Sequence, residues 1–393
     1  MQKFCVKSWC FKLYITVEGD LNIARRKFLK IAGLSAAMGI SPGFALKRDG
    51  NIHGSSSLQD LKLNPVKISP DRVIRTIVGL RPYRPSGFVV RTEPVNSKTV
   101  VHNYGHGGAG ITLSWGTSQL AVDIALQTNK KSFAVIGCGV VGLSTAILLQ
   151  RHGFKVTIYA KDLPPATTSN IAGGFWFPTS IYEKGKVSDQ FQTQFDLACK
   201  ISHRMFQDYI GDYYGVWWTD QYSLGESNDF PGGKELYPNI KEYNNQHNNF
   251  GFDYVQQFST MMIEPPIYLN ALRRDFFLAG GEIKVRTFQS LKDVASLRES
   301  VIINCTGLGS GKLFNDTEIT PVRGQLCILM PQPEIDYCYS GIVDGQFIYM
   351  LPRKDGILLG GTFQKGNWSL TPDDSDSEMI LSRHLAIAKS MGG

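Results

Sequence analysis

The sequence lacks the cysteine patterns of disulfide-rich and zinc-binding proteins. Its seven cysteines form no CxxC pair and show no zinc-ligand spacing, so neither a disulfide framework nor a metal site is expected. Five of them follow the first 45 residues. Because five is an odd number, at least one thiol should remain free even in an oxidising compartment.

Long apolar runs and basic clusters are also missing. No stretch is apolar for long enough to form a permanent membrane span, so none is expected after N-terminal processing. The net charge of +7 is modest for 393 residues, and Lys and Arg are scattered rather than interleaved with aromatics, which argues against nucleic acid as a partner. The remaining composition, 42% hydrophobic, is that of a globular protein long enough for two domains.

The first 45 residues resemble a twin-arginine export signal. The sequence ARRKFLK (24–30) precedes a mildly apolar segment (31–40) and then SPGFA, with cleavage expected after Ala45. We therefore expect the twin-arginine translocation machinery as a partner and a periplasmic or otherwise exported location. The alternative is a basic N-terminal helix of the mature protein. The stretch before Arg25 is long for such a signal, which favours a true start near Val17. Residues 46–60 are polar and read as a linker.

Residues 133–159 predict a dinucleotide-binding unit. A short buried strand enters a GxGxxG turn made by Gly137, Gly139 and Gly142, and a helix and a second strand follow in the required order. The first glycine permits the tight turn, the second admits a pyrophosphate, and the third lets the helix pack on the strand. The free N–H groups of that helix would then face the phosphates.

Two segments upstream carry further candidates. In GLRPYRP (79–85), a proline follows each of Arg81 and Arg84, which favours extended backbone and lets both arginines project into one cavity; a solvated surface loop is the alternative. In VVHNYGHGGAGITLSWG (100–116), glycines precede a predicted helix and suggest close approach to a ligand. His102 and His106 lack an evident carboxylate partner and are interpreted as structural.

These two segments resemble the C-terminal signature of the D-amino-acid oxidase family of flavoproteins, and the GxGxxG unit resembles that family's N-terminal FAD fingerprint. The order is reversed, so the sequence is similar to a natural circular permutant joined at residues 127–132. The resemblance implies an α/β, Rossmann-like FAD-binding domain of the glutathione-reductase type, interleaved with an α+β substrate domain on a mixed or antiparallel sheet. The implied substrate-domain segments are 61–98, 178–264 and 321–393, and the FAD-binding segments are 99–177 and 265–320.

The resemblance also implies FAD as cofactor and a set of contacts to it. Lys161 stands where an acidic ribose ligand is expected, so Asp162 is the candidate for that contact. The implied cofactor-binding residues are Gly105, Gly107, Gly108, Gly110, Ile111, Thr112, Gly137, Gly139, Val140, Val141, Gly142, Asp162, Thr167, Thr168, Gly174, Phe175, Phe288, Cys305, Thr306 and Gly307.

For the substrate, the resemblance implies that Arg81 holds a carboxylate in a bidentate pair, that Tyr349 adds a hydroxyl donor, and that backbone near Gly108 accepts from the amine. A core role is the alternative for Tyr349. Arg323 would either pair with the flavin region or brace the seam between domains. No lid tyrosine can be matched within residues 340–345.

The implied reaction is oxidative deamination of a D-amino acid by hydride transfer to flavin N5, with oxygen as acceptor and a 2-oxo acid, ammonia and hydrogen peroxide as products. Because the cofactor carries the difficult step, no side-chain base is required. A glycine or secondary-amine oxidase, an amino-acid dehydrogenase and a non-catalytic flavin-binding protein remain alternatives. A homodimer is one option for assembly. A second cation in the pocket would favour acidic substrates, and an apolar wall would favour neutral ones.

Overall fold

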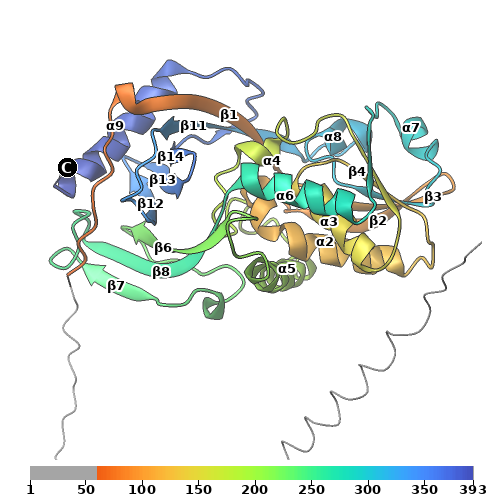
Figure 1. Ribbon diagram of the computed structural model, residues 1–393, viewed down its shortest axis with the longest axis horizontal. Helices are drawn as coiled ribbons and strands as arrows, with labels where there is room; N and C mark the ends of the chain where they lie inside the picture. Colours follow the sequence, from red (N-terminus) through yellow and green to blue (C-terminus); the bar gives the residue numbers. More distant parts are fainter. Residues whose placement is uncertain (1–59, 393) are drawn as a thin grey trace, which may run out of the picture. The chain divides into compact units, whose positions relative to one another are not determined.

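Two β-sheets organise residues 60–392, the part of the chain that the computed structural model describes (Figure 1). The predicted export signal and nearly all of the predicted linker lie outside these residues and stay predictions. None of the helices within 60–392 combines the length and apolar character that a membrane span requires. The five cysteines of this part of the chain are all free.

The first sheet has six strands in the order β2-β3-β10-β4-β5-β9 and is parallel except for the antiparallel pair β2–β3. All four residues of β4 are buried, as expected of a parallel strand covered on both faces. The bounds are β2 Val89–Val95, β3 Lys98–Tyr104, β4 Phe133–Ile136, β5 Val156–Ala160, β9 Glu282–Val285 and β10 Val301–Asn304.

Helices of the first sheet pack against one another and against its strands. The helix that follows the GxGxxG turn is α3 (Val140–Arg151), which packs between α2 (Gly110–Leu126) and α6 (Pro265–Leu278). Helix α5 (Asp189–Gln207) packs on the other side of α2. The predicted succession of strand, turn, helix and strand is confirmed as β4, α3 and β5. Three short helices complete this region: α4 Thr168–Ile171, α7 Leu291–Ala295 and α8 Gly309–Leu313.

The second sheet has nine strands, β1-β11-β14-β13-β12-β6-β8-β7, with β15 paired to β11. Its pairs are antiparallel except β12–β6, so the sheet is mixed, as predicted. Helix α9 (Asp374–Ser390) packs on β11 and β14. The bounds are β1 Val73–Tyr83, β6 Val216–Leu224, β7 Lys241–Asn244, β8 Tyr254–Ile263, β11 Thr320–Leu329, β12 Tyr337–Val343, β13 Gln346–Arg353, β14 Gly356–Gly360 and β15 Gln364–Lys365.

The segment 61–98, assigned from the sequence to the substrate domain, is divided between the two sheets. Strand β1 belongs to the nine-stranded sheet, whereas β2 pairs with β3 in the six-stranded one. The chain therefore crosses between the sheets before residue 89. The turn between β1 and β2 contains Arg84, and this arginine does not reach the large cavity described below.

Arg84 instead forms a largely buried ion pair. Its Nε donates to Asp316 Oδ2 at 2.8 Å, and the hydroxyl of Tyr104 donates to the same oxygen at 2.8 Å. Burial raises the pKa of Asp316, but the hydrogen bonds from Tyr104 and Arg84 outweigh it and leave that pKa below its usual value. The expectation that both arginines project into one cavity is thus wrong for Arg84, which ties the end of β1 to the segment after α8.

The start of the described chain lies beside its end. The hydroxyl of Tyr337 donates to the carbonyl of Asn64 at 2.7 Å and lies 3.9 Å from the sulfur of Met391. Val66 and Met391 belong to one apolar cluster under α9. Figure 1 shows the first described residues running past the C-terminal end of α9. The connection at 127–132, by contrast, lies between α2 and β4 and is mostly exposed.

The Asp316 pair predicts a pH-dependent contribution to stability. The folded-state pKa of Asp316 lies below its unfolded value of about 4, so the contribution is complete above that pH and is lost as the pH falls through the lowered pKa. Asp316→Asn should therefore lower the free energy of unfolding by about 3 kcal/mol near pH 7. Urea unfolding from pH 3 to 7 measures this. A difference between wild type and variant that does not shrink in acid would contradict the assignment.

The circular permutation predicted from the sequence leads to a second test. A chain that runs from 131 to 392, continues through a short glycine-serine linker and ends with 61–128 should fold, because the new joint connects ends that already meet at Tyr337. Its circular dichroism and urea unfolding should match those of the parent. The control opens the chain between Ile302 and Ile303, both fully buried in β10, and should not fold. If neither rearranged chain folds, the new linker between residues 392 and 61 is not tolerated, which would contradict this prediction.

Candidate flavin and substrate site

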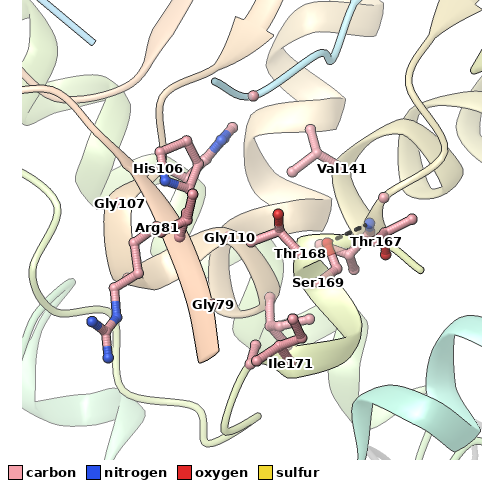
Figure 2. Close-up of a pocket in the computed structure, with 18 of the residues that line it drawn as sticks. Gly79, Arg81, His106, Gly107, Gly110, Val141, Thr167, Thr168, Ser169 and Ile171 are labelled. Atoms are coloured by element: carbon pink, nitrogen blue, oxygen red, sulfur yellow. Dashed lines mark hydrogen bonds between the residues drawn. The ribbon is translucent and has the colours of Figure 1, made fainter. Parts of the chain in front are cut away.

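One cavity of about 860 Å³ runs from the carboxyl ends of the parallel strands to the nine-stranded sheet. Its lining comes from the loops after β3, β4, β5, β9 and β10, and from strands β1, β11, β12 and β13. Ligands of open α/β sheets bind at the carboxyl ends of such strands. Figure 2 shows Arg81, His106, Val141, Thr167 and Thr168 around this space.

The turn after β4 has the geometry that the glycine pattern predicts. Gly137 adopts φ +113°, and a side chain there would collide with the carbonyl of Cys305. A side chain on Gly142 would collide with the carbonyl of Gly137, so the start of α3 lies tightly against the turn. Ser169 Oγ accepts from the backbone N–H of Val140 at 3.0 Å. The first turn of α3 faces the cavity, as a phosphate site at a helix N-terminus requires.

The loop after β3 forms another part of the cavity wall. Gly105 and Gly107 adopt positive φ, and Gly107 lies against the carbonyl of Ser180. His106 lines the cavity, but its Nε2 lies 2.9 Å from Thr117 Oγ1 and its ring stacks on Phe88. Burial lowers the pKa of His106 to about 3, so its imidazole is neutral near pH 7.

His102 differs from the sequence-based interpretation in one respect. It does have a carboxylate partner: its Nε2 lies 3.0 Å from Glu93 Oε2, across the β2–β3 pair, and its Nδ1 lies 3.0 Å from the amide of Asn304. The side chain is fully buried and does not line the cavity. Burial lowers its pKa although Glu93 opposes the shift. Its position therefore agrees with a structural role.

The two cysteines that line the cavity are not activated. Burial raises the pKa of Cys138 to about 12 and that of Cys305 to about 12. Both are therefore neutral thiols at physiological pH. No cluster of three or more His, Cys, Asp or Glu side chains that could hold a metal occurs among residues 60–392.

At the end of β5 and β9, the cavity is lined by charged and aromatic side chains. Lys161 and Asp162 follow β5, are largely exposed and approach each other to 3.5 Å. Arg286 follows β9 and lies over the ring of Phe288, 4.8 Å from its centroid. Sequence reasoning missed Arg286. Arg286 directly follows a parallel strand, as Lys161 does, and this position could have marked it as a candidate for the cofactor site.

Most sequence-predicted cofactor residues line this cavity, and two do not. Thr112 is buried and donates from its hydroxyl to the carbonyl of Ala109, and Gly142 packs against Gly137 behind the cavity wall. Arg323 also lies outside. It is buried and bonds Asp376 at 2.7 Å, together with Gln325 and the carbonyls of Ser369 and Thr371. It therefore braces the start of α9 within the substrate-domain segment 321–393, which is neither of its two predicted roles, because all of these partners belong to that same segment.

Arg81 and Tyr349 converge in the half of the cavity formed by the nine-stranded sheet. They come from β1 and β13, strands separated by β11 and β14, and Arg81 Nη2 lies 3.5 Å from Tyr349 Oη. Arg81 Nη1 also approaches the carbonyl of Thr362 at 3.4 Å. Both contacts are long for hydrogen bonds and leave much of the guanidinium fork free for a ligand.

Two glycines in the intervening strands make this convergence possible. A methyl group on Gly324 of β11 would lie 2.6 Å from Arg81 Nη2, and one on Gly360 of β14 would lie 2.6 Å from Tyr349 Cε2. The arginine and tyrosine side chains therefore lie flat across their neighbouring strands and meet above the sheet. Sequence reasoning named neither glycine in this role.

Gly108 lines the same cavity as this pair. It is exposed to the cavity, and its N–H donates to the carbonyl of Ser180 at 3.0 Å. The β12–β13 hairpin also contributes to the lining, through Gln346 and the half-exposed Phe347. The hairpin tip, 340–345, contains no tyrosine.

A comparison with known families decides the assignment. The model of the family described as FAD dependent oxidoreductase (DAO) matches residues 61–124 and 132–390. The chain belongs to this family. Its similar curated proteins include a D-amino-acid oxidase of Dictyostelium discoideum, 32% identical over 271 residues (66% of this chain and 73% of the relative), and a D-aspartate oxidase of Homo sapiens, 31% identical over 268 residues (66% and 76%).

Two solved structures are similar to this chain in fold. Glycine oxidase from Geobacillus kaustophilus has a TM-score of 0.51 at 14% identity, with 66% of this chain and 79% of that chain covered. L-proline dehydrogenase from P. horikoshii has a TM-score of 0.50 at 15% identity, with 67% and 78% covered. The predicted fold class is confirmed: an FAD-binding α/β domain joined to a substrate domain on a mixed sheet.

FAD is the cofactor of the DAO family, and the cavity has the features that it requires. The tight turn at Gly137 and the N-terminus of α3 suit a pyrophosphate, and the cavity continues from there to Arg81. The gap in the family match, 125–131, falls on the predicted permutation joint. The second matched segment makes up about two thirds of the chain, the same share that the relatives cover. Both agree with a permuted order, which stays a prediction.

Gly324 provides a test of the convergent pair. Gly324→Ala should push the Arg81 guanidinium aside at little cost in stability, because the end of a flexible side chain can move. Binding of propionate to the FAD-loaded protein can be followed by flavin absorbance. Its affinity should fall on the order of tenfold in Gly324→Ala and by about 30-fold or more in Arg81→Ala.

The double variant separates this effect from general damage. If Gly324 acts through Arg81, then Gly324→Ala should have no further effect in the Arg81→Ala background. Additive losses of affinity, or loss of bound FAD in Gly324→Ala, would contradict the proposed positioning.

Proposed function

We propose that this protein is an FAD-dependent oxidase of D-amino acids. The observation that carries the proposal is the convergence of Arg81 and Tyr349 on the cavity, across two glycines that leave room for them. A guanidinium fork beside a phenolic hydroxyl is suited to a carboxylate. The relatives named D-amino-acid oxidase and D-aspartate oxidase support this choice of substrate.

In this proposal the chain binds and orients the amino acid. Arg81 donates two N–H groups to the α-carboxylate, and Tyr349 donates its hydroxyl to the same group. The exposed backbone at Gly108, which lines the same cavity, accepts from the substrate amine. These contacts fix the α-carbon between the nine-stranded sheet and the glycine turns, which is the positioning that hydride transfer needs.

Among residues 60–392, the histidine and the two cysteines that line the cavity are not suited to act as a base. His106, Cys138 and Cys305 are all neutral near pH 7 and their pKa values lie far from neutrality, so none is suited to exchange a proton at this pH. Bound FAD would accept the hydride from the α-carbon and pass two electrons to oxygen. Water then hydrolyses the released imino acid. The sum is amino acid, water and oxygen giving 2-oxo acid, ammonia and hydrogen peroxide.

We also propose that the protein is exported by the twin-arginine machinery. The proposal rests on ARRKFLK, the weakly apolar segment after it and the small residues that precede position 46. This route carries folded proteins, which suits a chain that must bind FAD.

Reduction of the bound flavin under anaerobic conditions tests the proposed activity. D-alanine should bleach the flavin absorbance, whereas L-alanine should not, and air should then restore it with formation of hydrogen peroxide. Arg81→Ala should keep FAD but lose most of the bleaching rate, while Arg91→Ala, on the exposed face of β2, serves as the matched control.

Other outcomes would point to the alternatives. Faster bleaching by glycine or sarcosine than by D-alanine would favour a glycine or secondary-amine oxidase. Bleaching without reoxidation by air would favour a dehydrogenase. No bleaching by any of these amines would contradict an amine-oxidising function.

A further inference from the structure

The part of the cavity beside Tyr349 is lined by uncharged polar side chains. Ser340 on β12 is the direct cross-strand partner of Tyr349 on β13, which places their Cβ atoms about 5 Å apart. Gln221 on β6 contacts Ser340, and Asn228 follows the end of β6. Ser340, Gln221 and Asn228 all line the cavity, so they lie where the side chain of a substrate held by Arg81 would extend.

Ser340 is held as a hydrogen-bond donor. The Gln221 side chain donates to the carbonyl of Tyr222 at 2.9 Å and to Ser340 Oγ at 2.9 Å. Because a backbone carbonyl only accepts, the Gln221 atom that makes both contacts is the amide nitrogen. The Ser340 oxygen therefore accepts from Gln221, and its own proton is free to be donated to a ligand.

Asn228 is held as an acceptor. Its side-chain nitrogen donates to Ser223 Oγ at 2.7 Å and to Gln256 Oε1 at 3.1 Å. The orientation of the Gln256 amide is fixed, since the same oxygen also accepts from the backbone N–H of Asn228 at 3.0 Å. The donors of the Asn228 amide are thus used by the protein, and its oxygen is left to accept. Beneath Ser340, the oxygen of Gln221 is buried and lacks a hydrogen-bond partner among the described residues.

The nucleotide end and the substrate end of the cavity differ in their charged side chains. Three cationic side chains line it within residues 60–392: Arg81, Lys161 and Arg286. Lys161 and Arg286 follow β5 and β9 of the six-stranded sheet, at the nucleotide end. Only Arg81 comes from the sheet that carries Ser340 and Tyr349, and the substrate α-carboxylate uses it. A second carboxylate would meet the acceptor oxygen of Asn228 without a cation to offset its desolvation.

We infer that the preferred substrates are D-amino acids whose side chain ends in a carboxamide. Such a group donates from its NH2 to Asn228 and accepts at its oxygen from Ser340, so both polar atoms of the ligand are satisfied. A carboxylate satisfies one contact and is repelled at the other, and an alkyl group leaves both protein groups unpaired. The inference rests on the proposed oxidation of D-amino acids and names the substrate class of the same site.

Three substrates of nearly the same shape test this inference: D-asparagine, D-aspartate and D-leucine. The FAD-loaded enzyme should show kcat/KM for D-asparagine higher by about tenfold or more than for either of the others, since each of these would leave a buried polar group of the protein unpaired. D-glutamine and D-glutamate repeat the comparison with a longer side chain. Equal or greater kcat/KM for D-aspartate or D-leucine would overturn the inference.

A substitution at Ser340 tests whether this residue causes the preference for D-asparagine. Ser340→Ala should lower the ratio of kcat/KM for D-asparagine to that for D-alanine by about tenfold, because D-alanine has no group that reaches Ser340. Ser382→Ala, on the exposed face of α9, is the matched control and should leave the ratio unchanged. An unchanged ratio in Ser340→Ala would overturn the assignment of the donor.

D-alanine also separates the two levels of the proposal. If D-alanine reduces the flavin but D-asparagine has no advantage over its isosteres, the carboxamide inference fails and the proposed function stands. If no D-amino acid, D-alanine included, reduces the flavin, the proposed function fails and this inference falls with it.

Discussion

The contact between Arg81 and Tyr349 sets the requirements that the rest of the site meets. The two side chains come from strands with two others between them, and they can meet only because Gly324 and Gly360 remove the side chains that would lie in between. A strand glycine normally weakens a sheet, since it has no side chain to pack and loses more conformational entropy on folding. Here that weakness has a local use, because the space is filled by a guanidinium and a phenol.

The remaining architecture places this pair opposite a nucleotide site. The six-stranded sheet ends in loops at Gly105, Gly137 and Cys305 that border the same cavity. Arg84 is close to Arg81 in the sequence, and Arg323 lies on β11, the strand next to Arg81. Each of these two arginines is bonded to an aspartate and serves to hold segments of the chain together. Arg81 is left without a carboxylate partner in the described chain, which is the state that a ligand-binding cation needs.

The parts of the fold that the sequence predicted are those encoded locally. The unit β4–α3–β5 was readable because a buried strand, a glycine turn and an apolar helix follow one another within 27 residues. Arg81 and Tyr349 were found through family resemblance. What could not be read were pairings between distant segments: Glu93 with His102, Asp316 with Arg84, and β2 with the six-stranded sheet rather than with β1. Gln221 and Asn228 lie in a segment without a motif, and their free oxygens are defined only by hydrogen bonds that the folded chain makes.

Binding of a carboxylate by Arg81 and Tyr349 is the central property of this site. A crystal structure of the FAD-loaded protein with propionate, which has a carboxylate but no amine to oxidise, tests this directly. We predict that both carboxylate oxygens lie within hydrogen-bond distance of the Arg81 guanidinium, with one also near the Tyr349 hydroxyl. A propionate bound elsewhere, with Arg81 turned toward a protein carboxylate, would contradict the account.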